Sequence, residues 1–111
     1  MKIRTSRKFD KEIKRLSKKH KSVLEDLRVL TESVIDNPTQ GQSLGKNCYK
    51  IRMAISSKNK GKSGGARVII LVQIIDDLVV LLSIYDKSEK ETISDSELDD
   101  LINDFNSKKE D

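Results

Sequence analysis

Three runs rich in β-branched and aliphatic residues, all between positions 48 and 82, constrain the fold of this chain more than any other feature. They cover residues 48–55, 66–75 and 78–82. A polar segment of Gly, Lys and Ser separates the first run from the second, and Asp76-Asp77 separates the second from the third. Such runs, divided by turn-forming residues, are typical of strands joined as hairpins. The sequence therefore predicts an antiparallel meander at the centre of the fold.

Apolar residues recur at helical spacing on both sides of the predicted meander. The three stripes are Phe9, Ile13 and Leu16; Val23, Leu27, Leu30 and Val34; and Leu98, Leu101, Ile102 and Phe105. Positions three or four residues apart share one face of a helix, so each stripe predicts an amphipathic helix. Asn37-Pro38 ends the second helix, because the residue before a proline disfavours helical geometry. Ser94 and Glu97 have the spacing of a capping box at the start of the third.

The order of these elements predicts an α+β fold. Met1–Thr5 is short, alternating and charged, as expected of an edge strand. The full order is then β-α-α-β-β-β-α: an antiparallel sheet of about four strands packed against an N-terminal helical hairpin, with a C-terminal helix. Thr39–Asn47 is expected to be a loop, and His20 a surface residue of the helix pair. At 111 residues, the chain fits a single domain over residues 1–111.

Charge is distributed unevenly over the predicted sheet. No Asp or Glu occurs from Asn37 to Ile75, whereas seven cations do: Lys46, Lys50, Arg52, Lys58, Lys60, Lys62 and Arg67. Lys50 and Arg52 alternate with apolar residues, so they share the strand face turned away from the helices, about 7 Å apart. Arg67 lies near the start of the next strand. Cations without carboxylates to neutralise them indicate a face that meets phosphate.

The two ends of the chain carry opposite charge. Residues 1–21 contain ten Lys/Arg and two carboxylates, while residues 86–111 contain ten Asp/Glu and four lysines. One interpretation is that both ends form ordinary solvated helix faces. The other is a basic front, built from the N-terminal region and the sheet, that faces nucleic acid, with an acidic back.

Four cations are the candidate catalytic residues: Lys50, Arg52, Arg67 and Lys87. The first three project from adjacent predicted strands and the fourth follows the last strand, although each taken singly is equally well a solvated charge. Together they suit metal-free RNA cleavage, in which the ribose 2′-hydroxyl attacks its own phosphate and cations stabilise the charge on the phosphoryl oxygens. A lysine whose pKa is lowered by neighbouring cations serves as the base. The predicted RNA-binding residues are Lys14, Lys18, Lys58, Lys60, Lys62, Tyr85 and Lys90.

Other functions are disfavoured by what the sequence lacks. Gly61-Lys62-Ser63 has no glycine five positions earlier and precedes a strand, so it does not fit a nucleotide-triphosphate loop. His20 and Cys48 are the only histidine and cysteine, too few for a zinc site. A His-based catalytic triad would have to use His20, which falls in the least structured part of the predicted helix pair, so it is disfavoured as well. We therefore expect no metal or other cofactor. The lone cysteine fits a reducing cytoplasm, and no segment resembles a signal peptide or a membrane span.

Four segments together resemble the RelE/ParE superfamily of toxins from bacterial type II toxin–antitoxin modules, most closely its HigB-type branch. They are Cys48–Arg52, Gly61–Ile69, Ile84–Glu89 and Ser94–Leu98. The resemblance extends over nearly the whole chain. Its moderately specific part is a Gly-Gly-Ala-Arg turn into a strand, with Tyr-x-Lys at the end of the next strand.

The resemblance implies a small cytoplasmic ribonuclease that enters the ribosomal A site, beside 16S ribosomal RNA, and cuts mRNA there. It also implies inhibition by a cognate antitoxin, often a helix-turn-helix repressor. By position, Lys50 and Arg52 match the basic strand pair of the family. Arg67 matches its phosphate-stabilising arginine, and Lys87 falls where the family often has an arginine that is proposed as a proton donor.

Two positions depart from the family pattern, and two other functions stay open. Lys87 in place of an arginine weakens bidentate contact with phosphate but keeps a charge. Some members carry a base-stacking tyrosine near the start of the last helix, where this chain has Ile93 or a neighbour. Tyr85 is the candidate substitute, and a tyrosine at the edge of the core is the alternative. The first open function is a ParE-like poison of DNA gyrase, against which the dense cations argue. The second is a non-catalytic RNA-binding relative.

Overall fold

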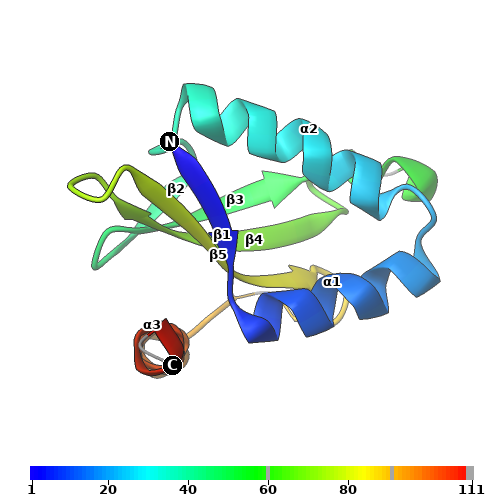
Figure 1. Ribbon diagram of the computed structural model, residues 1–111. Helices are drawn as coiled ribbons and strands as arrows, with labels where there is room; N and C mark the ends of the chain where they lie inside the picture. Colours follow the sequence, from blue (N-terminus) through cyan, green and yellow to red (C-terminus); the bar gives the residue numbers. More distant parts are fainter. Residues whose placement is uncertain (60, 91, 110–111) are drawn as a thin grey trace.

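A five-stranded sheet forms the middle layer of the protein, with helices on both faces (Figure 1). The computed structural model describes residues 1–59, 61–90 and 92–109. The strands are β1 (Lys2–Thr5), β2 (Gln42–Gly45), β3 (Cys48–Met53), β4 (Ala66–Gln73) and β5 (Leu78–Asp86), in the spatial order β1-β5-β4-β3-β2. The helices are α1 (Arg7–Lys19), α2 (Val23–Asp36) and α3 (Asp95–Lys109), with a short 3-10 helix, η1, at Ser56–Lys58. Within the described ranges, no helix is both long and apolar enough to cross a membrane.

The predicted meander and the α+β class are confirmed. β3, β4 and β5 pair antiparallel as consecutive neighbours, with Ile51 opposite Val68 and Val68 opposite Ile84. β1 lies at the outer edge of the sheet, parallel to β5, with Ile3 opposite Val79. The sheet is therefore mixed and not wholly antiparallel as expected, because β1 pairs parallel to β5 whereas the other strand pairs are antiparallel.

The expected loop over residues 39–47 is wrong in part, because it contains β2. This strand pairs antiparallel with β3, with Ser43 opposite Tyr49 and Gln42 opposite Lys50. Its residues are mostly exposed and polar, so backbone pairing rather than side-chain burial holds it at the edge. The following turn is tight, because Gly45, Lys46 and Asn47 all have positive φ. An edge strand of this composition has no alternating pattern from which to predict it.

The core lies on both faces of the sheet. On one face, α1 and α2 bury Phe9, Leu16 and Val34 against residues such as Val68 and Leu81, which confirms the helical hairpin. On the other face, α3 buries Leu98 and Leu101 against residues of β4 and β5, and Figure 1 shows α3 on the side of the sheet away from α2. The face on which the cations were expected is therefore partly covered by α3.

Beyond the end of β1, the backbone of β5 is hydrogen-bonded by side chains of Ser6, the N-cap of α1, and of Glu12 within α1. Ser6 Oγ donates to the carbonyl of Leu82 at 2.9 Å. Glu12 Oε1 then accepts hydrogen bonds from Ser83 Oγ at 2.8 Å and from the amide of Ile84 at 3.3 Å. Burial raises the pKa of Glu12 despite these bonds. The second half of β5 is thereby fixed to α1, and this half leads to the candidate site.

Candidate functional site

Arg52, Arg67 and Tyr85 form a row across three adjacent strands. In the sheet register, Arg52 of β3 lies opposite Arg67 of β4, and Arg67 lies opposite Tyr85 of β5. Neighbouring strands are about 4.8 Å apart, so the two arginines start from adjacent backbone positions. Arg52 is exposed, whereas Arg67 and Tyr85 are only 4% and 5% exposed. The row is therefore open to solvent at Arg52 and covered beyond it.

The guanidinium of Arg67 is held by backbone carbonyls and not by a carboxylate. Nη1 donates to the carbonyls of Lys62 at 3.0 Å and Ala66 at 3.1 Å, and Nη2 donates to the carbonyl of Ser63 at 3.3 Å. These bonds leave Nε–H and one Nη2–H without a partner among the described residues. Carbonyl partners fix a cation in place but do not neutralise its charge. The arrangement therefore keeps a full positive charge beside Arg52.

The loop that covers Arg67 is itself anchored at both ends. At its start, the carboxylate of Asp26 accepts hydrogen bonds from the amide of Ser56 at 2.9 Å and from its hydroxyl at 2.5 Å. Burial tends to raise the pKa of Asp26, but the bonds from Ser56 outweigh it and hold that pKa below its usual value. At the other end, the carbonyl of Gly65 accepts from the amide of Lys87 at 3.0 Å. The backbone at Gly65 and Ala66 therefore contacts both Lys87, through its amide, and Arg67, through its guanidinium.

Gly65 allows the loop to pack directly on β3. A Cβ at this buried position would lie 2.1 Å from the carbonyl oxygen of Met53 and 3.0 Å from the Cα of Ala54. We expect Gly65→Ala to lower the free energy of unfolding by about 1–3 kcal/mol, the range for overpacking a tight site. Urea unfolding measures this effect. Ser63→Ala, an exposed change in the same loop, is the control, and equal midpoints for the two variants would contradict the close-packing argument.

Asp86, which follows Tyr85 in β5, contacts three other segments: the end of α1, η1 and the turn after β5. This carboxylate is 3% exposed and accepts hydrogen bonds from Lys58 Nζ at 3.0 Å, from the amide of Ser88 at 2.9 Å and from Ser88 Oγ at 2.8 Å. Its Oδ2 lies 3.3 Å from His20 Nε2. Burial tends to raise the pKa of Asp86, but the bonds from Ser88 and Lys58 outweigh it and lower that pKa to about 2. The expectation of a surface helix histidine is wrong, because His20 caps the end of α1 and its side chain is only 18% exposed.

Lys50, Arg52 and Lys62 line one groove at the open edge of β3. This groove of about 430 Å³ is completed by Gln40, Gly41, Gln42 and Ile51. Within the described residues, none of the three cations forms an ion pair. The structure thus brings three of the predicted cations together, with Arg67 beside them under its loop. Lys87 follows the end of β5 with a half-buried side chain.

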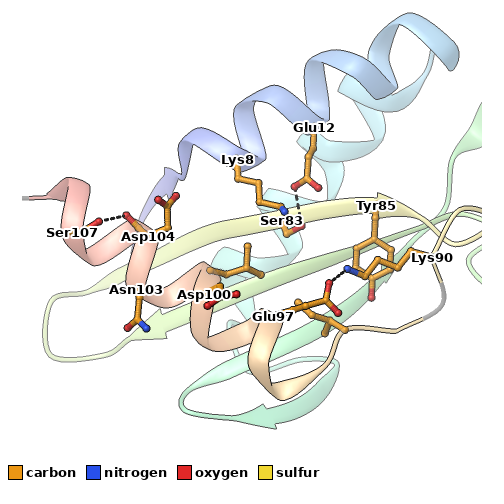
Figure 2. A pocket seen from close by; sticks show the side chains of 12 residues that line it. Lys8, Glu12, Ser83, Tyr85, Lys90, Glu97, Asp100, Asn103, Asp104 and Ser107 are labelled. Atoms are coloured by element: carbon orange, nitrogen blue, oxygen red, sulfur yellow. Dashed lines mark hydrogen bonds and ion pairs between the residues drawn. The ribbon is translucent and has the colours of Figure 1, made fainter.

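Tyr85, at the covered end of the row, and Lys90 line a separate cavity of about 620 Å³ between α1, β5 and α3 (Figure 2). Lys90 Nζ lies 5.7 Å from the centre of the Tyr85 ring and forms an ion pair with Glu97. The Tyr85 hydroxyl is buried and has no hydrogen-bond partner among the described residues, and burial raises its pKa. Carboxylates dominate the remaining charge of the lining: Glu12, Asp100 and Asp104. This cavity could not be predicted from the sequence, because it depends on where α3 packs.

The other predicted RNA-binding residues are not gathered at one site. Lys14 and Lys18 are exposed on α1. Lys58 is turned inward, with 13% of its side chain exposed, and is paired with Asp86. Lys60 lies outside the described residues. In the part of the chain that the structure describes, no three His, Cys, Asp or Glu side chains are placed so as to hold a metal ion.

Fold and site together define a class: a small α+β protein with a mixed sheet that carries a basic groove at one edge. The family model of the RelE toxin of the RelE/RelB toxin–antitoxin system matches residues 1–106, and the chain belongs to this family. Membership makes it the toxin component of such a system and implies an antitoxin partner.

One solved structure with the same fold is a double arginine-to-alanine mutant of the E. coli toxin RelE in the free state. It is 17% identical to this chain, with a TM-score of 0.62, and the match covers 96% of this chain and 95% of that one. At this identity the likeness concerns the fold alone. A comparison with curated proteins gave no match.

Proposed function

We propose that this toxin is an endoribonuclease that cuts mRNA in the ribosomal A site and so inhibits translation. The observation that supports it most directly is the basic groove: Lys50, Arg52 and Lys62 line it, and Arg67 lies opposite Arg52. None of these cations is neutralised by a carboxylate among the described residues. A concentrated, unneutralised positive charge attracts the phosphate backbone of RNA.

The proposed reaction needs no protein nucleophile. The 2′-oxygen forms a bond to the adjacent phosphorus and the bond to the 5′-oxygen breaks, which leaves a 2′,3′-cyclic phosphate and a 5′-hydroxyl. Lys50 takes the 2′ proton or stabilises charge, and Lys87 donates a proton to the leaving oxygen or holds charge. Arg52 and Arg67 stabilise the negative charge that builds up on the phosphoryl oxygens.

The basic surface of α1 supports binding to ribosomal RNA. Arg7, Lys11, Lys14 and Lys18 are exposed and follow one another at helical spacing, so they share one stripe. In contrast, Arg15 and Lys19 are paired with Glu89. In the proposal, this stripe and its neighbours from Arg4 to Lys21 contact 16S ribosomal RNA in the cytoplasm. The cognate antitoxin, proposed to be of the helix-turn-helix type, blocks the toxin until it is removed.

Primer extension on a defined message tests the proposal. We expect new 5′ ends within the A-site codon when the toxin meets ribosomes programmed with that message, and no cut on the same message without ribosomes. The new 5′ ends should carry hydroxyl groups. A supercoiling assay with DNA gyrase is run in parallel. Inhibited supercoiling without cut ends would favour the gyrase-poison alternative, and ribosome binding without cut ends would favour a non-catalytic relative.

A further inference from the structure

A second hollow adjoins the basic groove and continues it under α2. It has a volume of about 310 Å³, and Gln40, Arg52 and Lys62 line both hollows. Most of the residues that line only the second hollow are apolar. They are Val29 and Leu30 of α2, Met53 at the end of β3 and Ala54 just after it. Val29 is 54% exposed. The edge of β3 is thus bordered first by cations and then by an apolar wall.

The backbone leaves this edge of the sheet open. The pairing of β2 with β3 stops at Gln42 and Lys50, whereas β3 continues to Met53. The chain turns away at Gly41, where φ is +91° and a Cβ would lie 2.5 Å from the carbonyl oxygen of Lys50. Only glycine tolerates both this φ and this close approach. The opening at the edge of β3 is therefore built into the β2–β3 geometry.

The polar groups of the two hollows are arranged for an anionic ligand that also has an apolar part. The one carboxylate in the lining, Asp26, is already bonded to Ser56 and Ser22. Gln40 donates through Nε2 to Ser33 and to the carbonyl of Asn37, all at 3.0 Å. These bonds hold its side chain in place, and its Oε1 accepts no hydrogen bond from the described residues. A fixed acceptor thus lies between the cations and the apolar wall.

We propose that this double hollow is the subsite for the nucleotide beside the cut bond, an inference that rests on the proposed function. The phosphate of a single-stranded RNA lies against Lys50, Arg52 and Lys62. Its base is unstacked and lies against Val29, Met53 and Ala54, where Oε1 of Gln40 accepts a hydrogen bond from its polar edge. Unpaired bases are the part of RNA that proteins read in this way, by their flat faces and exposed edges. Charge complementarity favours an RNA strand over a protein segment as the occupant.

Val29→Asp tests the subsite, and Leu24→Asp is its matched control. Both residues are exposed on α2, at 54% and 58%, and only Val29 lines the hollow. Cleavage of ribosome-bound message is measured for both variants and for wild type. We expect Val29→Asp to raise KM about tenfold with kcat little changed, because it replaces the apolar wall with a charge that repels phosphate. Leu24→Asp should leave both constants near those of wild type.

Each remaining outcome decides a separate question. If wild type does not cut at all, the proposed function fails before the subsite is tested, and binding of a short single-stranded RNA then decides the subsite alone. Equal KM values for the two variants, with wild type active, overturn the subsite. It is also overturned if Val29→Asp weakens antitoxin binding and leaves KM unchanged, since the occupant is then the antitoxin. Val29→Ala, which adds no charge, should raise KM about two- to threefold and show that folding is not the cause.

Discussion

Replacing Arg67 by alanine is expected to lower the rate of message cleavage about a hundredfold or more, the scale for losing one preorganised stabiliser of transition-state charge. Two effects combine. The guanidinium supplies an unneutralised charge one strand away from Arg52. It also binds the carbonyls of Lys62 and Ser63, so its loss releases the loop that carries Lys62 into the groove. Single-turnover cleavage on ribosomes measures the rate.

Two variants separate charge at this site from charge in general. Arg28→Ala removes one positive charge from α2, where Arg28 is exposed and paired with Glu25 and Glu32, and should cut like wild type. Arg67→Lys keeps the charge but loses the forked geometry, and should fall between wild type and Arg67→Ala. If Arg67→Ala cut as fast as Arg28→Ala, Arg67 would have no part in the reaction.

The fold was predictable from the sequence because its signals are local. The apolar stripes of α1 and α2, the alternation in β3 and the break at Asn37-Pro38 each act within a few residues. The capping box is one example: the amide of Glu97 donates to Ser94 Oγ, and the amide of Ser94 donates to Glu97 Oε1, both at 3.1 Å. β2 was missed because an exposed edge strand needs no apolar pattern to pair.

Which cations lie next to one another in the candidate site was predictable from the sequence only in part. The meander with its alternation placed Lys50 and Arg52 on one face of the first strand, with Arg67 on the next. The sequence could not show that Arg67 is buried under the preceding loop. The contacts that hold it there are hydrogen bonds from its guanidinium to three backbone carbonyls of residues 62–66, and backbone carbonyls leave no trace in a sequence pattern. Nor could the sequence show that Lys58 turns inward to Asp86, since Lys58 lies in η1 and Asp86 at the end of β5, 28 residues further along the chain. Tertiary contacts of this kind decide which cations are paired with a carboxylate and which are not.

Asp86 is the second residue at which we expect a large effect, here on stability. Its carboxylate is nearly fully buried and paired with Lys58, whose side chain is only 13% exposed. Removing one member of a buried pair strands the other, so Asp86→Asn should lower the free energy of unfolding by about 2–4 kcal/mol at pH 7. Urea unfolding measures it. Asp76→Asn, in the exposed turn before β5, is the matched control and should change stability by less than about 0.5 kcal/mol.

The same pair predicts how the effect depends on pH. The pKa of Asp86 is about 2 in the folded protein, below the value of about 3.9 for an unfolded chain. A lowered pKa gives stability that is fully present above the unfolded value and is lost as pH falls through the folded one. The difference between wild type and Asp86→Asn should therefore be largest above about pH 4 and shrink toward about pH 2. A difference that stays constant over this range would contradict the ionic origin.

A double-mutant cycle assigns the effect of Asp86 to its partner. If the pair with Lys58 carries most of it, Lys58→Met in the Asp86→Asn background should cost much less than Lys58→Met in wild type. The bonds to Ser88 and the contact with His20 remain in the Lys58→Met variant, so what is left of the Asp86→Asn effect there measures them. Strict additivity of the two changes would place the stabilisation in the loop from 86 to 90 and not in the ion pair. The position of the end of β5, just before Lys87, would then depend more on the hydrogen bonds between Asp86 and Ser88 than on the ion pair with Lys58.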